Sequence, residues 1–370
     1  MDLDFTEEQN ILRHSISSVC NDFANFEILR SIEDTETGFS KDFWNKLIEL
    51  GITGIAIPEK YGGSGMGLLD AAIIYEELGR SLALAPHFIS SYVSANLIND
   101  LGDDHQKSEL LPPIASGQII LTLGWLEEGS TCFKSGINLK LEKKKDFFVI
   151  NGIKTMVPYA SSADKIILFL RDEEDIRAGI IDLNQKGIHL SYEYNHAKTS
   201  MFSVEFDGVE IHSSAMLGNG DIWSVWESIT HRCQVLLAAE ATGGSERSLY
   251  IGRDYSLERE AFGQKIGGFQ SIAHYLADGL VEVEANKLMT YQTAWAHDDK
   301  QNIATLSAMT KLQCCNSFRD ISATTIQIFG GMGFTIEADP QLFYRRAKHL
   351  QNFLWDSDYL EKQLENNFFK

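Results

Sequence analysis

The chain of 370 residues is acidic and moderately apolar, and these properties narrow the classes of protein to which it can belong. Hydrophobic residues make up 44% of it, enough to build two or three packed domains. Its 32 Lys and Arg residues against 52 Asp and Glu residues give a net charge of −20, which disfavours binding to nucleic acids and to anionic membrane surfaces. The five cysteines form no CxxC pair and no metal-binding spacing, a pattern typical of a reduced cytoplasmic protein.

The amino-terminal residues predict a helix that begins at once. Thr6 has the character of an N-cap residue, and Gln9 stands where its reciprocal partner in a capping box would be. The segment lacks the basic start and apolar middle of a signal peptide, and no apolar run reaches the roughly 18 residues of a membrane span. We therefore expect no targeting segment, no membrane span and a cytoplasmic location.

Residues 1–117 are predicted to form a helical domain. Apolar residues recur at helical spacing in 42–52 and 68–84, and the loop 54–67 between them is rich in glycine. Such a loop either bends tightly or lets a ligand approach its backbone.

Residues 118–220 are predicted to form a central β domain, because the apolar period changes from 3.6 to 2. Short alternating runs predict an antiparallel β-barrel or sandwich, and "KKKD" at 143–146 resembles a hairpin turn. No GxGxxG motif follows a strand, so a Rossmann-type cofactor site is not expected. The predicted strands lie at 119–125, 137–142, 147–152, 164–171, 178–183, 188–194 and 202–211.

Residues 221–370 are predicted to form a C-terminal four-helix bundle. The long helical patterns are joined by brief breaks, which favours an antiparallel arrangement. They cover 223–257, 269–297, 302–329 and 340–368. The order of helices, then strands, then a bundle makes the chain an α+β multi-domain protein.

Four segments, taken together, resemble the acyl-CoA dehydrogenase family over essentially the full chain. They are "IPEKYGGSGMG", "FFVINGIKTMVPYASSAD", "REAFGQKIGGFQSIAHYLAD" and "QIFGGMGF...FYRRAK". The resemblance implies an FAD cofactor, an acyl-CoA thioester substrate and an electron-transfer flavoprotein as electron acceptor. It also implies a homotetramer or dimer; some divergent members instead form heteromeric complexes in which one subunit supplies the catalytic base.

The same resemblance implies which residues bind FAD. It pairs Arg259 with the pyrophosphate of a neighbouring subunit's FAD, and it places Phe262 near the adenosine half. A pyrophosphate needs a fixed cation and open backbone donors, which the two glycine-rich breaks of the bundle provide. The implied FAD-binding residues are Arg259, Phe262, Gln270, Gln327, Gly330 and Gly331.

The catalytic base of the family has no counterpart at its usual positions. The resemblance implies a glutamate that removes the α-proton, at the position of Leu354 in most members or of Cys233 in a second branch. Neither residue is a carboxylate. Asp356, two residues beyond Leu354, is the predicted substitute, and Glu240 and Glu227 are the alternatives.

The predicted flavin contacts in the β domain also differ from the family pattern. Glu127 and Ser130 match its E-P-G-x-G-S-D segment only loosely. Met156 replaces a tryptophan beside the flavin, and Pro158 replaces a threonine that donates a hydrogen bond to it.

Three functions stay open on this basis. The first is an FAD-dependent acyl-CoA dehydrogenase that desaturates the α,β bond. The second is an FAD-binding subunit of a heteromeric dehydrogenase that lacks its own base. The third is a flavoenzyme of the same fold with other chemistry, such as an oxidase, reductase or monooxygenase.

Overall fold

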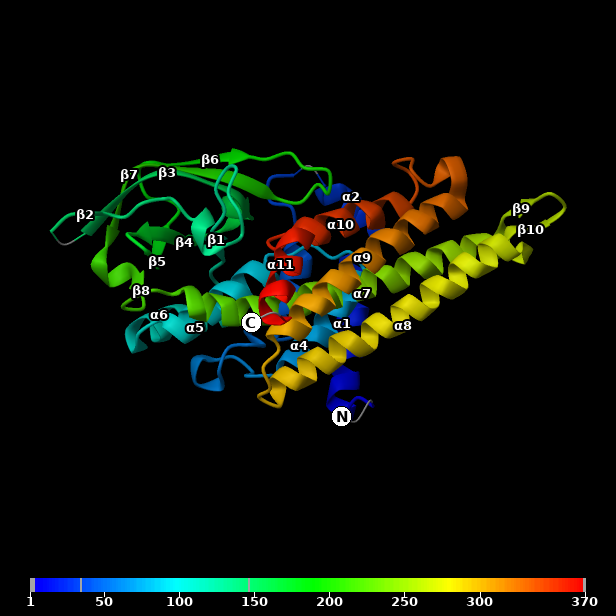
Figure 1. Cartoon of the computed structure of the whole chain (residues 1–370), viewed down its shortest axis with the longest axis horizontal. Coiled ribbons are helices and arrows are strands. Elements are labelled where there is room, and N and C mark those ends of the chain that lie inside the picture. The colour runs from blue at the N-terminus through cyan, green and yellow to red at the C-terminus, as the bar shows by residue number, and fades with distance from the viewer. Residues whose placement is uncertain (1–3, 34, 146, 369–370) are drawn as a thin grey trace. The chain divides into compact units, whose positions relative to one another are not determined.

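The computed structural model describes residues 4–33, 35–145 and 147–368, which form two compact units. Unit 1 takes its described residues from Met1–Leu29, Gly67–Ala83 and His231–Lys370, and unit 2 from Arg30–Met66 and Leu84–Thr230. Helices come first along the chain, then strands, then long helices, as predicted (Figure 1). The predicted division at 117 and 220 stays a prediction, because the units interleave the early helical segments.

The amino-terminal helices divide between the units. Unit 1 contains α1 (Glu7–Phe23) and α4 (Leu68–Arg80), and unit 2 contains α3 (Lys41–Glu49), α5 (Ala95–Leu101) and α6 (Asp104–Ala115), while α2 (Phe26–Ile32) runs from one to the other. The predicted capping box at the start of α1 is confirmed. Gln9 N–H donates to the Thr6 hydroxyl at 3.2 Å, and Thr6 N–H donates to the Gln9 side chain at 3.1 Å.

The glycine-rich loop between α3 and α4 bends tightly onto itself. A Cβ atom at Gly63 would lie 2.0 Å from the carbonyl oxygen of Ile57 and 2.5 Å from that of Gly54. Glycine is therefore required here by close backbone packing within the loop, which is the first of the two roles expected for it.

Two four-stranded sheets form the β part of unit 2 (Figure 1). The first has the order β1 (Leu121–Gly124), β4 (Lys165–Asp172), β5 (Asp175–Asp182), β8 (Met216–Leu217). The second has the order β2 (Glu142–Lys143), β3 (Phe147–Pro158), β7 (Met201–His212), β6 (Ile188–Tyr192). Among the described residues no pairing closes either sheet into a barrel.

The two sheets share one apolar core, as in the sandwich alternative of the prediction. Its buried residues include Ile166 and Leu168 of β4 and Val204 and Phe206 of β7. One pairing departs from the antiparallel prediction: β1 and β4 are parallel. Part of the predicted turn at 143–146 lies outside the described residues, since Asp146 is not among them; the flanking β2 and β3 are antiparallel.

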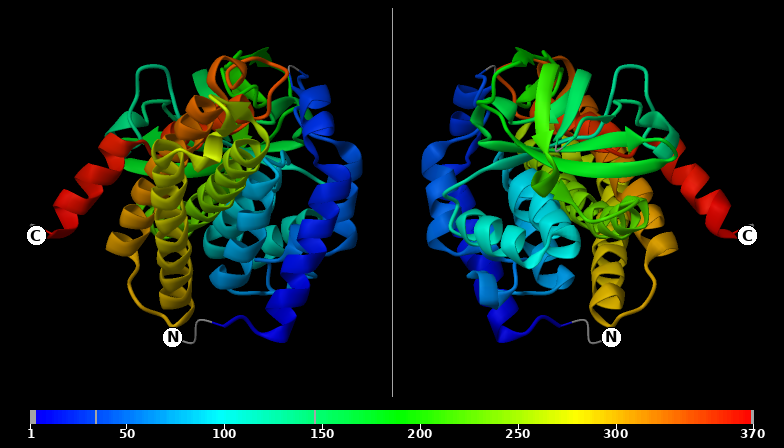
Figure 2. Two further views of the ribbon diagram at one scale, coloured as in Figure 1. Left: turned by 90° about the vertical axis from the view of Figure 1, so that its right-hand side faces the viewer. Right: turned by 90° about the vertical axis from the view of Figure 1, so that its left-hand side faces the viewer.

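The long C-terminal helices begin and end close to the predicted residues. They are α7 (Trp223–Glu258), whose first turns belong to unit 2, α8 (Gln270–Asp298), α9 (Ala304–Phe329), α10 (Pro340–Asn352) and α11 (Ser357–Phe368). Within unit 1, α9 packs against α8 and against both α10 and α11, and α4 packs against α8. Figure 2 shows α8 and α9, in yellow and orange, side by side.

The fourth predicted helix, 340–368, was wrong as a continuous element, because it is interrupted between α10 and α11. Leu354 there has a left-handed backbone with φ of 62°. The carboxylate of Asp356 accepts a hydrogen bond from Tyr359 N–H at 2.8 Å, which is the contact of an N-cap residue and starts a new helix.

A buried lysine of α9 holds this break in place. Lys311 is fully buried, and its ammonium donates to the carbonyl oxygens of Leu350 at 3.1 Å and Trp355 at 2.6 Å. The cation satisfies carbonyl groups that the interruption leaves without helical partners.

Candidate active site

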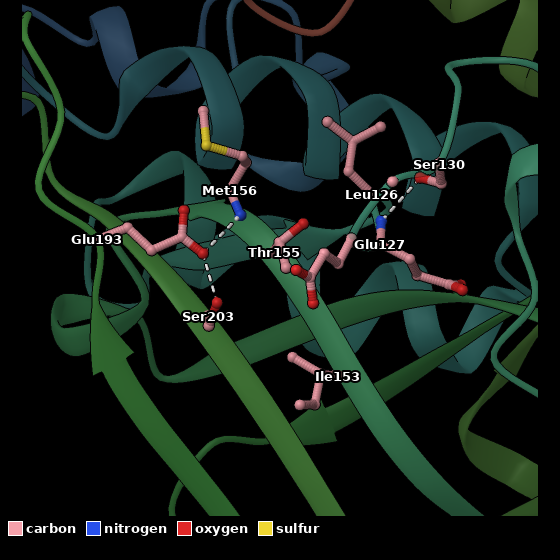
Figure 3. Close-up of a pocket in the computed structure, with 10 residues that line it drawn as sticks. Leu126, Glu127, Ser130, Ile153, Thr155, Met156, Glu193 and Ser203 are labelled. Atoms are coloured by element: carbon pink, nitrogen blue, oxygen red, sulfur yellow. Dashed lines mark hydrogen bonds between the residues drawn. The ribbon is translucent and has the colours of Figure 1, made fainter.

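A cavity of about 580 Å³ opens in the β part of unit 2 (Figure 3). Its volume falls within the roughly 300–1,000 Å³ of small-molecule sites. It is lined by Leu126, Glu127, Glu128, Gly129, Ser130, Ile153, Thr155, Met156, Glu193 and Ser203. The loop after β1 and the middle of β3, which the sequence singled out separately, therefore form walls of one cavity.

The loop wall is fixed by a buried ion pair. Lys154 has no exposed side-chain surface, and its ammonium donates to Glu127 at 2.7 Å and to the carbonyl oxygen of Trp125 at 3.1 Å. The Glu127 carboxylate also accepts hydrogen bonds from the N–H groups of Asn138 and Leu139, each at 2.9 Å. These contacts tie the loop to β3 and to the segment that follows the loop.

Burial and charge oppose each other in this pair. Burial lowers the pKa of Lys154 to about 8, against the raising effect of the Glu127 charge. Burial alone would raise the pKa of Glu127, but Lys154 and the two N–H donors outweigh it, so the pKa of Glu127 is below its ordinary value. Both groups are therefore charged near neutral pH.

A bulge in β3 shapes the second wall. In the pairing of β3 with β7, Lys154 faces Val204 and Val157 faces Phe202, so Thr155 and Met156 together face the single residue Ser203. Such a bulge redirects side chains out of the regular alternation. Met156 adopts a left-handed backbone, with φ of 53°, and the residue is 38% exposed.

Glu193, just beyond β6, holds the two sides of the bulge. Its carboxylate accepts a short hydrogen bond from the Ser203 hydroxyl and a longer one, 3.4 Å, from Met156 N–H (Figure 3). Pro158 lies deeper: it is buried, its carbonyl accepts from the Thr122 hydroxyl at 2.5 Å, and it does not line the cavity.

The first three predicted FAD-binding residues lie in and beside the connection between α7 and α8, in unit 1. Arg259 follows the last residue of α7, and its exposed guanidinium has no hydrogen-bond or ion-pair partner in the described part of the chain. Phe262 is 95% exposed at the tip of the hairpin formed by β9 (Glu260–Ala261) and β10 (Gln264–Lys265). Gln270 is the exposed first residue of α8.

The other three predicted FAD-binding residues lie at the end of α9. Gln327 is exposed in the last turn, and Gly330 N–H donates to its carbonyl oxygen. Apart from the adjoining backbone, no atom of the described residues lies within 4 Å of a Cβ built at Gly330 or Gly331, so the backbone there is open to a ligand. The rings of Tyr255 and Phe329 stack with centroids 3.9 Å apart, which brings the ends of α7 and α9 side by side.

The two positions implied for the catalytic base are apolar and closed. Leu354 is 5% exposed, and Cys233 is fully buried. Burial raises the pKa of the Cys233 thiol to about 12, so it is protonated at neutral pH. The neighbouring Gln234 is also buried and is held by Ser307, whose hydroxyl donates to it at 2.9 Å.

Each of the three predicted substitutes makes a contact of its own. Asp356 is exposed and caps α11, and Glu227 is exposed and accepts from the indole N–H of Trp223 at 3.0 Å. Glu240 faces Arg346 at 3.4 Å within unit 1. Burial raises the pKa of Glu240, against the nearby charge of Arg346.

Comparison with known proteins decides the family. A model of the N-terminal domain of acyl-CoA dehydrogenases matches residues 6–118, and a model of their C-terminal domain matches residues 223–353. Together the two matches cover more than half of the chain. The chain belongs to the acyl-CoA dehydrogenase family, whose members are flavin oxidoreductases.

Relatives of this acyl-CoA dehydrogenase family chain include enzymes named for either direction of reaction. The short-chain specific acyl-CoA dehydrogenase of Clostridium acetobutylicum is 26% identical over the whole of both chains. Subunit CarC of the caffeyl-CoA reductase-Etf complex of Acetobacterium woodii is 26% identical over 93% of each chain. Butyryl-CoA dehydrogenase from Megasphaera elsdenii has the same fold, with a TM-score of 0.92 over the full length of both chains at 23% identity.

Two features of the cavity were missed by sequence reasoning. Glu193 belongs to no recognisable motif, since it lies in a polar stretch after β6. Its side chain lines the cavity and contacts the bulge of β3 at Met156 N–H. The ion pair between Glu127 and Lys154 joins residues 27 positions apart, and only Glu127 had been singled out in the sequence. In the described part of the chain no helix combines the length and apolar character needed to cross a membrane.

Proposed function

We propose that this chain is an FAD-dependent oxidoreductase that acts on the α,β bond of an acyl-CoA thioester. The observation that carries the proposal is the cavity of unit 2. Its walls are the two segments in which the family resemblance implies flavin contacts, the loop at Glu127–Ser130 and the strand at Met156.

The residues of the cavity fit an isoalloxazine ring. Leu126, Ile153 and Met156 offer apolar surface for a flat aromatic ring, and Thr155 and Glu193 offer a hydroxyl and a carboxylate at its polar edge. A few polar groups in an apolar cavity are the usual composition of a cofactor site. FAD, when bound, supplies the acceptor or donor of a hydride at Cβ of the substrate.

The pyrophosphate half of FAD requires other groups, which unit 1 provides. The guanidinium of Arg259 is exposed and has no partner among the described residues, which suits it to a phosphate oxygen. The open backbone at Gly330 and Gly331 supplies N–H donors without adding charge. In the proposed homo-oligomer these groups serve the FAD of a neighbouring subunit. An electron-transfer flavoprotein is the proposed redox partner, by analogy with the complex named for CarC.

The test is flavin content followed by titration. We expect the purified chain to carry FAD, shown by its absorbance and by the nucleotide released on denaturation. Anaerobic addition of short and medium acyl-CoA thioesters should bleach that absorbance in the dehydrogenase direction, and enoyl-CoA thioesters should reoxidise the reduced protein in the other. A chain that takes up no FAD, or FAD that responds to neither class, would refute the proposal.

A second function is favoured by the closed positions at Leu354 and Cys233. We propose it as the alternative: a flavin-binding subunit whose catalytic base is supplied by a homologous partner. In that case wild-type protein binds FAD without being bleached, and Leu354→Glu restores bleaching because only the carboxylate was missing. Leu354→Gln is the matched control, since it has the same shape without a charge that can accept the proton.

A further inference from the structure

Glu193 places a carboxylate in the cavity wall at the point where β3 bulges. It accepts hydrogen bonds from the Ser203 hydroxyl and from Met156 N–H, so both the charge and the bulge are held in one arrangement (Figure 3). Neither contact neutralises the charge, because a hydroxyl and a backbone N–H are uncharged donors. The side chain is half-buried, so water screens it only in part.

The other charged groups of the cavity do not cancel that of Glu193. The Glu127 carboxylate is paired with Lys154 at 2.7 Å, so these two contribute almost no net charge. Glu128 is exposed and acidic, and among the described residues no lysine or arginine lines the cavity. The net charge facing a bound ring is therefore negative, and Glu193 is its best-fixed component.

We infer that Glu193 lowers the reduction potential of the flavin, which adapts the site to reducing an enoyl-CoA thioester. The inference rests on the proposed function. Taking up two electrons and one proton gives the flavin one additional negative charge. A fixed carboxylate beside the ring repels that charge and stabilises the oxidised form relative to the reduced form.

We assign Glu193 to the flavin and not to the substrate. Its carboxylate accepts a hydrogen bond from the N–H of Met156, the residue that the family resemblance places beside the flavin, whereas a base would have to face the substrate from the opposite side. The charge of Glu193 therefore acts on the reduction potential of the flavin and not as a proton acceptor for the substrate.

The direction of reaction follows from the potential. In enoyl reduction, FAD bound here would supply a hydride to Cβ of the thioester from its reduced form, and a proton from solvent would be added at Cα. Re-reduction for the next turnover would take two electrons from an electron-transfer protein and one further proton from solvent. A lower potential makes hydride delivery more favourable and abstraction of a hydride from a saturated acyl-CoA less favourable.

The experiment compares the midpoint potential of bound FAD in four proteins, by equilibration with a reference dye during slow anaerobic reduction. Glu193→Gln removes the charge and keeps the shape. We expect at least a tenfold change in the equilibrium constant for reduction, which for a two-electron couple is a rise of about 30 mV. Ser203→Ala keeps the charge and removes its anchor, so its potential should lie between the two. Glu210→Gln, on β7 but outside the cavity lining, is the matched control and should leave the potential unchanged.

The outcomes separate the two proposals. A wild-type chain without FAD would overturn the proposed function and this inference with it. FAD bound normally in all four proteins, with Glu193→Gln at or below the wild-type potential, would overturn the inference alone. If Glu193→Gln fails to fold, equal potentials in Ser203→Ala and wild type would do the same.

Discussion

Replacing Lys154 by methionine tests whether the buried ion pair maintains the cavity wall. The side chain of Lys154 is fully buried and that of Glu127 is 13% exposed, so the substitution leaves a largely buried carboxylate without its cation. Breaking a buried pair from one side costs about 3–5 kcal/mol. Because Glu127 keeps its hydrogen bonds from Asn138 and Leu139, we expect the lower end, about 3 kcal/mol, for Lys154→Met.

Urea unfolding followed by tryptophan fluorescence measures this loss. Trp125 and Trp226 are buried in unit 2 and pack edge to face, 5.0 Å apart, so they report on the part of the chain that contains the pair. The double variant Lys154→Met, Glu127→Gln removes both charges, and should be more stable than Lys154→Met alone. The reasoning would be refuted if the free energy of unfolding of Lys154→Met lay within about 0.5 kcal/mol of the wild-type value, which is below the usual cost of a lost hydrogen bond. It would also be refuted if the stability lost by the double variant equalled the sum of the losses of the two single variants.

The cost of Lys154→Met should also depend on pH, with a definite sign. In the wild type the folded pKa of Glu127 is lowered, so its contribution to stability is present above about pH 4.3 and is lost as the pH falls further. In the variant, burial acts on the carboxylate without the opposing cation, so the folded pKa of Glu127 is higher than in the wild type and protonation costs the variant less stability as the pH falls from 7 towards 5. The difference between the two proteins should therefore narrow over this range, in which Lys154, with a pKa of about 8, is protonated. A difference that stays constant between pH 7 and 5 would contradict the argument.

Three further predictions concern unit 1. Arg259→Ala should weaken FAD binding by one to two decades, because a charge-assisted contact is worth about 1.5–3 kcal/mol. Affinity is measured by flavin-fluorescence titration, with Lys265→Ala on the same hairpin as the control. An Arg259→Ala variant that binds FAD as tightly as wild type would count against the assignment. Asp356→Asn should retain the cap of α11, since asparagine caps as well as aspartate. If the variant is as stable as wild type but its flavin is no longer bleached by acyl-CoA, Asp356 is the base. Unchanged bleaching would exclude it. Lys311→Met should lower the free energy of unfolding by about 2–3 kcal/mol, because two buried carbonyl groups lose a charged donor. It should also make the break at 353–356 accessible to proteases. A variant as resistant to proteolysis as wild type would disprove the role of the lysine.

The sequence predicted the features that depend on local order. The capping box at Thr6, the change of apolar period and the limits of the long helices follow from neighbouring residues, so they could be found without a structure. The parallel pairing of β1 with β4 could not, because it joins segments some 40 residues apart. The break at Leu354 was missed for a related reason: the segment contains no glycine or proline, and the lysine that holds it is on another helix.

The residues of the candidate site divide in the same way, into those that a local motif indicates and those that only the tertiary structure brings to the site. Glu127, Ser130 and Met156 were found through short motifs, each within one segment, and the structure places all three around one cavity. Glu193 was not found because its place in the cavity depends on a bulge in β3, which lies two strands away from β6 in the sheet. The assignment of six residues to FAD binding stays a prediction. The open backbone at Gly330 supports it.

The geometry of the break between α10 and α11 bears on what the missing glutamate means. Leu354 has a left-handed backbone, which costs a leucine on the order of 1 kcal/mol or more. Such a conformation persists only when the surroundings impose it, and here they do so three times: through the buried Trp355, the cap at Asp356 and the ammonium of Lys311. These three contacts lie within unit 1 and account for the strained turn without any carboxylate at Leu354. The turn is therefore explained by packing and not by the needs of a base, which agrees with the proposal that the proton is transferred by a group from another segment or another subunit.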